Sequence, residues 1–235
     1  LYPGLLDLVL LARAGGVKRI ALSTNGSAPL RQYLDLVTAG VNDFSVSLDA
    51  CCMSTASVMA GGDVPFHDVV CNIFRLSQLA YVTVGVVVAE HNADEVESIV
   101  NFAHARGVTD IRLIPAAQLG TRMADVWVSK NVLAAHPILR YRIERACAGL
   151  PVRGLEPWDS GLPCGLVLDD MLVSGEWHYP CVIYFREGGQ PIGRVGPNMR
   201  CERELWHRSH SPWSDPICRE QCLDVCVAYN RKHAE

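Results

Sequence analysis

The sequence lacks the features that mark membrane, secreted and nucleic-acid-binding proteins. Its longest apolar run, residues 82–89, is far too short to cross a bilayer. No basic-then-apolar leader opens the chain. Positive charge is not in excess, because 21 Lys and Arg stand against 25 Asp and Glu, which gives a net charge of −4 and no electrostatic basis for binding nucleic acid. We therefore expect a soluble, cytoplasmic protein whose partners include neither a membrane nor a nucleic acid.

The composition leaves room for a folded core. Apolar residues make up 49% of the 235 residues and charged residues 20%, so global disorder is excluded. This length fits one large domain, or a medium domain and a small one. The chain begins with Leu and enters a helix-like stretch at residues 2–14. We interpret this start as that of a fragment whose upstream residues are missing.

Strand-like and helix-like segments alternate through the first half of the chain. Apolar runs at residues 18–24, 43–49, 81–89 and 110–115 suit strands that are buried on both faces. Helical spacing marks residues 30–39, 66–79 and 94–106 between them. Such alternation with short loops predicts an α/β fold with a parallel sheet or barrel. Right-handed crossovers would then bring the carboxyl ends of all strands to one edge.

Small polar residues follow the predicted strands. Thr24, Asn25 and Gly26 end the first strand, and Ser47 and Asp49 end the second. In parallel barrels the working residues lie at these strand ends and in the loops after them. An Asn-Gly pair can also be a simple turn, and an Asp can be a simple helix cap. Both interpretations stay open at this point.

The second half of the chain has a different character. Residues 132–148 are expected to form one helix, and the Pro- and Gly-rich residues 151–163 to form a linker. This predicts a first domain at residues 1–150 and a small cysteine-rich domain at residues 164–235. Six of the ten cysteines lie in that tail, at Cys164, Cys181, Cys201, Cys218, Cys222 and Cys226. In a reducing compartment such a group indicates metal or redox chemistry more than disulfides.

The spacing of the tail cysteines predicts a metal site but leaves its ligands open. A hairpin turning near residues 173–175 would bring Cys164 and Cys181 together. In one straight helix Cys218 and Cys226 would lie about 12 Å apart, so either the chain bends or one of the trio with Cys222 is spare. Zinc is a rival to iron–sulfur, because Cys222 and Cys226 fit half of a zinc motif. We expect His178, His207 and His210 to be packing or surface residues. Four further cysteines are expected in the core: Cys51, Cys52, Cys71 and Cys147.

The order of these features resembles that of radical S-adenosylmethionine (SAM) enzymes. Residues 18–26 look like the third strand of that family, residues 40–50 like the fourth, and residues 82–92 and 110–118 like the fifth and sixth. The tail resembles the SPASM or "twitch" extension, whose opening motif is matched by Cys164, Gly175 and Cys181. The resemblance implies a partial (β/α) TIM-like barrel with strands 3–6 onward present, followed by an iron–sulfur domain.

The resemblance also implies roles for individual residues. Thr24, Asn25 and Gly26 would border the substrate and the methionine side of SAM, and Ser47 and Asp49 would lie near its ribose. Val88, Ile114 and Pro115 would lie near the adenine. The tail thiolates would hold one auxiliary [4Fe–4S] cluster, with the four ligands drawn from Cys164, Cys181, Cys218, Cys222, Cys226 and Cys201. The intact protein would also bind SAM and a second [4Fe–4S] cluster, reduced by a donor such as flavodoxin or ferredoxin.

Two motifs of the family are absent from the sequence. It contains neither the C-x3-C-x2-C loop that holds the catalytic cluster nor the Gly-Gly-Glu-Pro-type motif. We therefore expect the 235 residues alone to be inactive and the intact protein to be the enzyme. A peptide or protein substrate ranks first. A small molecule ranks second, for example a nucleotide cyclised in molybdopterin-precursor synthesis. The alternative from another class is a non-catalytic iron–sulfur or zinc protein that binds a partner.

Overall fold

The computed structural model describes residues 2–116 and 126–234. The chain divides into two compact units, Leu1–Leu150 and Pro151–Glu235. In the parts of the chain that are described, no helix is both long and apolar enough to cross a membrane.

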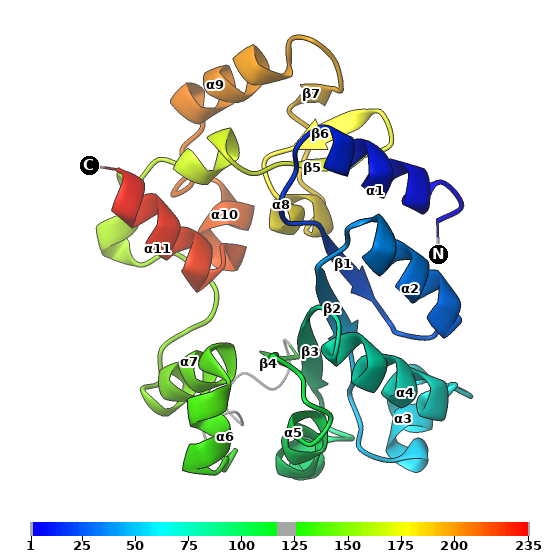
Figure 1. Cartoon of the computed structure of the whole chain (residues 1–235). Helices are drawn as coiled ribbons and strands as arrows, with labels where there is room; N and C mark the ends of the chain where they lie inside the picture. Colours follow the sequence, from blue (N-terminus) through cyan, green and yellow to red (C-terminus); the bar gives the residue numbers. More distant parts are fainter. Residues whose placement is uncertain (1, 117–125, 235) are drawn as a thin grey trace. The chain divides into compact units, whose positions relative to one another are not determined.

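The first unit is an α/β unit built around a four-stranded sheet (Figure 1). All neighbouring strands are parallel, in the order β1-β2-β3-β4. This is the fold class that the sequence predicts. The elements in chain order are α1 (Leu5–Ala14), β1 (Ala21–Thr24), α2 (Leu30–Ala39), β2 (Asp43–Ser47), α3 (Met53–Ala60), α4 (Phe66–Ser77), β3 (Tyr81–Val88), η1 (Ala93–Glu95), α5 (Val96–His104), β4 (Asp110–Pro115), α6 (Lys130–Ala135) and α7 (Pro137–Cys147).

Alternation along the strands gives the sheet two different faces. One face is apolar and buried, with Val46, Val84 and Leu113 among its members, and together with buried residues of the helices it forms the core of the unit. The opposite face carries smaller and more polar side chains, which we call the second face: Ser23, Ser45, Ser47, Thr83, Gly85, Val87, Arg112 and Ile114. Exposed positions such as Ser47 and Ile114 lie toward the carboxyl end of this face.

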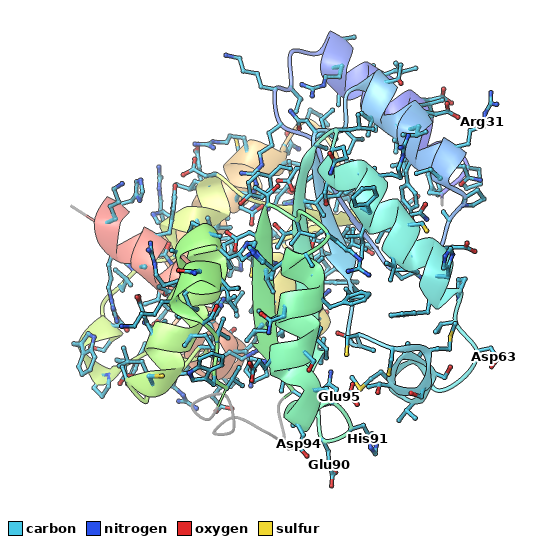
Figure 2. All side chains as sticks on the ribbon, turned by 60° about the horizontal axis from the view of Figure 1, so that its bottom comes forward. Arg31, Asp63, Glu90, His91, Asp94 and Glu95 are labelled. Carbon is cyan, nitrogen blue, oxygen red and sulfur yellow. The ribbon has the colours of Figure 1, made fainter. Side chains whose placement is uncertain are left out.

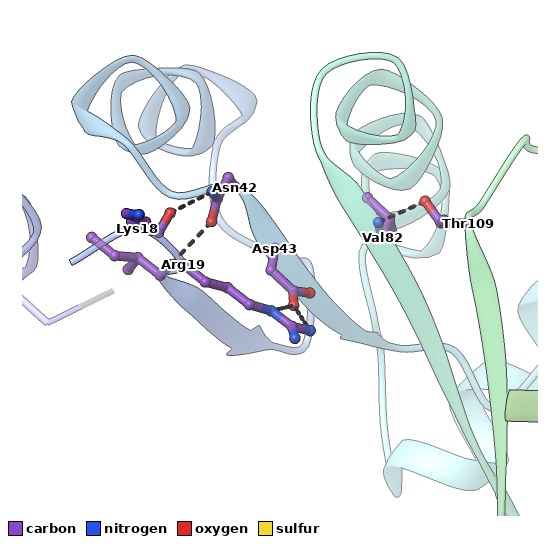
Figure 3. Close-up of polar contacts among 7 residues, drawn as sticks. Lys18, Arg19, Asn42, Asp43, Val82 and Thr109 are labelled. Atoms are coloured by element: carbon purple, nitrogen blue, oxygen red, sulfur yellow. Dashed lines mark hydrogen bonds and ion pairs between the residues drawn. The ribbon is translucent and has the colours of Figure 1, made fainter. Parts of the chain in front are cut away.

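The amino end of the sheet is shorter than the apolar pattern predicts. Strand β1 begins at Ala21 and not at residue 18. The Asn42 side chain takes the place of a strand partner there, since its Nδ2 donates to Lys18 O at 2.9 Å and its Oδ1 accepts from Ile20 N at 3.0 Å (Figure 3). Arg19 forms an ion pair with Asp43 of β2.

The segment expected as one helix at residues 132–148 is two helices. α6 ends at Ala135 and α7 begins at Pro137, because a residue before proline avoids helical geometry. His136 between them has a non-helical backbone with ψ of 89°. The first amides of α7 donate to the buried Asp110 carboxylate, from Ile138 N at 3.0 Å and from Leu139 N at 3.4 Å, which satisfies donors left open at a helix start. α3 was not predicted from the sequence.

The second unit is small and rich in turns. Its three-stranded antiparallel sheet has the order β5-β6-β7. The elements are η4 (Pro157–Asp159), η5 (Gly165–Leu168), β5 (Leu172–Ser174), β6 (Trp177–Tyr179), α8 (Val182–Arg186), β7 (Gly193–Arg194), α9 (Met199–Ser209), α10 (Pro216–Gln221) and α11 (Asp224–His233). Among its described residues the buried apolar side chains are Val167, Ile183 and Val227, so burial of apolar surface contributes little to its stability.

Residues 151–163, expected as a linker, are fixed to the second unit. Gly154 N donates to Cys222 O at 2.9 Å, and Leu155 N donates to Arg219 O at 2.8 Å. The Asp159 side chain, 2% exposed, forms an ion pair with Arg231 of α11 at 2.7 Å. Proline and glycine mark the irregular backbone correctly, but these contacts link distant residues that the local composition does not report.

Candidate functional site

The carboxyl edge of the parallel sheet holds the residues that the resemblance assigns to SAM. Thr24, Ser47, Val88 and Pro115 are the last residues of the four strands. A cavity of about 320 Å³ lies at this edge, and Asn25, Ser47 and Asp49 line it. Other lining residues come from α3, α4 and the loop between them, including Met59, Asp63, Phe66 and Val69.

The loop after β1 is held in one conformation by its neighbours. Gly26 has φ of +77°, and a Cβ there would lie 2.9 Å from Val46 Cγ1 and 3.0 Å from Val69 Cγ1. The buried Asn72 donates to Gly26 O at 2.8 Å. Glycine is therefore required by both the backbone angle and the space.

Thr24 and Asn25 have different surroundings within this loop. Thr24 Oγ1 is hydrogen-bonded to Tyr33 OH at 2.8 Å and accepts from Gly26 N at 3.1 Å. Asn25 is exposed, and its Oδ1 accepts from Ser27 N at 3.1 Å. In this arrangement Thr24 shapes the loop, while Asn25 presents its amide to the cavity.

Asp49 and Asn92 tie the end of β2 to the end of β3. Asp49 Oδ1 accepts from Val87 N at 2.6 Å. Burial raises the pKa of Asp49, and this hydrogen bond partly offsets the rise. Asn92 is 1% exposed; its Nδ2 donates to Asp49 O and to Val87 O, both at 2.8 Å, and its Oδ1 accepts from Ala89 N at 2.7 Å. Asn92 forms no side-chain cap of the helix after it.

The remaining predicted SAM residues do not line the same cavity. Val88 is 1% exposed and borders a second cavity of about 530 Å³, which Asp94, Glu97 and Trp127 also line. Ile114 is 39% exposed on the second face, and Pro115 pairs with Val88 across the sheet.

The loop after β3 carries several acidic side chains. Figure 2 shows Glu90, His91 and Asp94 projecting from this loop, with Glu95 beside them. Glu95 accepts a hydrogen bond from Thr55 of α3 at 2.8 Å, which connects the loop to α3.

Of the four cysteines of the first unit that we expected in the core, Cys51 is half-buried and packs against the core cluster. Cys52 is half-buried as the N-cap of α3. Cys71 and Cys147 are exposed on α4 and α7, so for these two the expectation is wrong.

Five of the six tail cysteines predicted as metal ligands line one small pocket in the second unit. They are Cys164, Cys181, Cys218, Cys222 and Cys226. Apolar side chains complete the lining, among them Leu166, Ile183, Trp206 and Ile217. Cys201 is exposed on α9 and is not part of this lining. All ten cysteines are free thiols, so no disulfide competes with metal binding.

Short elements on both sides of the hairpin position Cys164 and Cys181. β5 and β6 pair as expected, with Val173 opposite His178. The hairpin does not extend back to Cys164, because Gly165–Leu168 forms the 3₁₀ helix η5. Leu166 N there donates to Asn230 Oδ1 at 3.0 Å, a long-range bond that the local pattern does not contain. Cys181 is the N-cap of α8, and its sulfur accepts from Tyr184 N at 3.4 Å.

A buried arginine connects these two arms of the pocket. Arg203 of α9 is 5% exposed. It donates to Val167 O at 2.8 Å, to Tyr179 O at 2.9 Å, to Pro180 O at 3.2 Å and to Asp170 O. Sequence reasoning missed Arg203, since a single arginine on a polar helix carries no local signal of burial.

The last three cysteines converge because the chain bends. α10 ends at Gln221, and α11 begins at Asp224. Cys222 and Leu223 between them have ψ of 132° and 143°, which are extended values. In one straight helix Cys218 and Cys226 would be about 12 Å apart. Because the chain bends, Cys218, Cys222 and Cys226 all line the same pocket.

The surroundings of the pocket keep four of its five cysteines from ionising easily. Burial raises the pKa of Cys164, Cys181 and Cys218. A hydrogen bond from Cys222 to Cys226, together with burial, raises the pKa of Cys222, and the same bond lowers the pKa of Cys226. Iron–sulfur clusters are held by four thiolates, and the donor set here supplies five sulfurs in an apolar pocket. The residues present thus fit a four-thiolate cluster.

Comparison with known proteins gives both sequence and fold relatives. No family model matches the chain. It is 28% identical over 126 residues to a GTP 3',8-cyclase of Nitrobacter winogradskyi, covering 52% of this chain and 37% of that protein. It is 28% identical over 134 residues to a GTP 3',8-cyclase of Rhodopseudomonas palustris, covering 56% and 39%. The matches thus span about two fifths of the length of these curated relatives.

The fold is also found in a solved structure. The crystal structure of Streptococcus suis SuiB bound to S-adenosylmethionine matches with a TM-score of 0.55 at 10% identity, covering 91% of this chain and 53% of that one. At this identity the match is one of fold. The sequence relatives and the shared fold both agree with the resemblance to radical SAM enzymes seen in the sequence.

Proposed function

We propose that the whole protein to which this chain belongs is a radical SAM enzyme that reductively cleaves SAM. The observation that carries the proposal is the carboxyl edge of the parallel sheet, where Asn25, Ser47 and Asp49 line one cavity, in a fold shared with a SAM-bound structure. When bound, SAM and a reducing [4Fe–4S] cluster supply the 5′-deoxyadenosyl radical that abstracts a substrate hydrogen.

The described residues bind and orient SAM in this proposal. Ser47 and Asp49 hold the ribose through their oxygens, and Asn25 borders the methionine. Ile114 supplies the exposed apolar contact for the adenine, while Val88 and Pro115 support it from the ends of β3 and β4. Thr24, Gly26 and the buried Asn92 fix the loops from which these side chains project.

We further propose that the second unit holds one auxiliary [4Fe–4S] cluster in the five-cysteine pocket. The convergence of the thiols and the scarcity of buried apolar residues around them support this assignment. Small domains with too little buried apolar surface usually need a metal or disulfides to fold. No cysteine here is in a disulfide, so a metal is the stabilising group that we propose.

Iron and sulfide analysis of the anaerobically reconstituted chain tests the auxiliary cluster. Cys181→Ala is expected to lower iron and sulfide together, because Cys181 lines the pocket. Cys201→Ala is the matched control and is expected to leave both unchanged, because Cys201 is exposed on α9. Unchanged iron in Cys181→Ala would remove Cys181 from the ligand set, and a metal-free wild-type chain would remove the cluster.

A peptide or protein remains the substrate that we propose first. The GTP 3',8-cyclases match 52% and 56% of the chain. A nucleoside triphosphate needs several cationic partners, and among the described residues of the second face Arg112 is the cation.

Cyclisation of a nucleotide is the second candidate, and the sequence relatives named GTP 3',8-cyclase favour it. The two candidates are separated by measuring how much 5′-deoxyadenosine the intact protein releases. Stimulation of this release by a peptide favours the first candidate, and stimulation by GTP favours the second. The 235 residues alone are expected to release none, because they contain no C-x3-C-x2-C motif. Release by the chain alone would show that other residues can hold the catalytic cluster.

The remaining expectations belong to the same proposal. Ten free thiols fit a reducing cytoplasm, and a flavodoxin or ferredoxin would deliver the electron. A non-catalytic cluster or zinc protein remains the alternative from another class. It requires that the intact protein bind metal through the pocket and yet fail to cleave SAM.

A further inference from the structure

The pocket offers one thiol more than a four-thiolate cluster uses. Cys218 differs from the other four, because a histidine and a carboxylate lie beside it. His210 Nε2 is 3.6 Å from Cys218 Sγ and 3.8 Å from Asp215 Oδ2. One ligand atom from each of the three residues lies within 4.8 Å of the others.

We propose that His210, Asp215 and Cys218 form a separate binding site for one Zn²⁺ ion, which leaves Cys164, Cys181, Cys222 and Cys226 as the cluster ligands. The choice of these four rests on the proposed auxiliary cluster, whereas the zinc site itself rests on the three residues. A sulfur, an imidazole nitrogen and a carboxylate oxygen are the donors that zinc takes in proteins.

The distance from Cys218 to His210 fits tetrahedral zinc, and the distance from His210 to Asp215 is slightly long. With Zn–S of about 2.3 Å and Zn–N of about 2.0 Å, a tetrahedral angle places sulfur and nitrogen about 3.5 Å apart, and the structure has 3.6 Å. Nitrogen and oxygen ligands of zinc lie about 3.3 Å apart, so the 3.8 Å between His210 and Asp215 requires a small side-chain rotation. Three protein ligands leave the fourth position for water or another ligand.

The three side chains are already oriented by their neighbours. The His210 ring stacks on Trp206 with centroids 3.8 Å apart and an interplanar angle of 16°. Tyr184 OH donates to Asp215 Oδ2 at 2.9 Å, and Asp215 Oδ1 accepts from Cys218 N at 3.0 Å. Hydrogen bonds to a ligating carboxylate are a regular feature of metal sites. The His210 and Asp215 side chains are 15% and 16% exposed, so an ion can reach them from solvent.

Metal analysis of the full chain tests the site. The chain is first reconstituted anaerobically with iron and sulfide and is then titrated with ZnCl₂ in competition with a chromophoric chelator. We expect one zinc per chain in addition to the cluster iron. His210→Gln and Asp215→Asn are expected to weaken zinc binding by more than about 100-fold with iron and sulfide unchanged, and Tyr184→Phe by about tenfold. Asp215→Asn keeps the fold, because Asn is an equally good N-cap. His233→Gln, at the end of α11, is the matched control with no loss.

Cys218→Ser separates this site from the cluster. Loss of zinc with iron and sulfide retained supports the assignment. Loss of iron and sulfide would overturn it, because Cys218 would then be a cluster ligand and His210 only its hydrogen-bond neighbour. Absence of the additional zinc, or zinc binding unchanged in His210→Gln, would also overturn it. A chain that takes up no iron but binds zinc through His210 would refute the auxiliary cluster and support the zinc site.

Discussion

Replacing Arg203 is expected to unfold the second unit more effectively than replacing any single apolar residue there. Arg203→Met keeps the length of the side chain but removes every donor. Four backbone carbonyls, at Val167, Asp170, Tyr179 and Pro180, would lose the guanidinium that they share. These carbonyls belong to the segments that carry Cys164 and Cys181.

The size of the effect follows from the hydrogen bonds. A hydrogen bond to a charged group contributes about 1.5–3 kcal/mol, so four such bonds would sum to more than about 6 kcal/mol. Burying the guanidinium costs part of this free energy, and breaking a buried charged arrangement typically destabilises by about 3–5 kcal/mol. That loss is comparable with the whole stability of a small domain, which is about 5 kcal/mol at the low end.

Urea unfolding of the reconstituted chain, followed by iron–sulfur absorption and by circular dichroism, measures the effect. Arg208→Met on the same helix is the control, because Arg208 is exposed, and its effect is expected to stay within about 0.5 kcal/mol. A loss of less than about 1 kcal/mol in Arg203→Met would refute the reasoning, since it would mean that the four carbonyls find other donors at little cost.

Three further changes test the framework of the two units. Asn92→Ala is expected to destabilise the first unit by about 2–4 kcal/mol in urea unfolding, since it removes the side-chain partner of three part-buried backbone groups, and a loss below 1 kcal/mol would contradict this role. Gly26→Ala is expected to cost more than about 1 kcal/mol, because φ of +77° and contacts of 2.9 Å both oppose a Cβ; an equally stable variant would show that the loop relaxes. The hydrogen bond from Arg231 lowers the pKa of Asp159 below its ordinary value of 3.8, so the pair stabilises above that value and its contribution is lost as the pH falls through the lowered pKa. Asp159→Asn is therefore expected to cost about 1 kcal/mol at pH 7 and nothing in strong acid, and a cost that is the same at both pH values would contradict the ion-pair explanation.

The first unit could be predicted largely from periodicity. α2 and β4 have the expected bounds, because each is a regular run between clear end signals. β1 is shorter than expected, since the Asn42 side chain replaces strand pairing at residues 18–20. α3 was missed because Met53–Ala60 combines small and polar residues without a clear apolar face. The break before Pro137 follows from the proline itself, which opposes helical geometry at residue 136.

The candidate sites were predictable only in part. Spacing indicated that tail cysteines meet, and five of the six line one pocket. The bend at Cys222 was one of two alternatives that helix geometry allowed, and Cys201 could not be separated from the others by sequence position. Arg203 was missed because it acts through distant backbone groups. His210 was expected to be a packing or surface residue, and its position beside Cys218 depends on the turn between α9 and α10.

The scarcity of buried apolar side chains in the second unit, Val167, Ile183 and Val227 among its described residues, has a consequence for the life of the protein in the cell. With the proposed iron–sulfur cluster bound, much of the free energy of folding of this unit would come from the cluster, because metal binding and folding are coupled in such domains. In iron-starved cells, newly made chains would then have a folded first unit and an unfolded second unit. Proteases would remove that second unit, so the supply of iron would set how much complete protein accumulates.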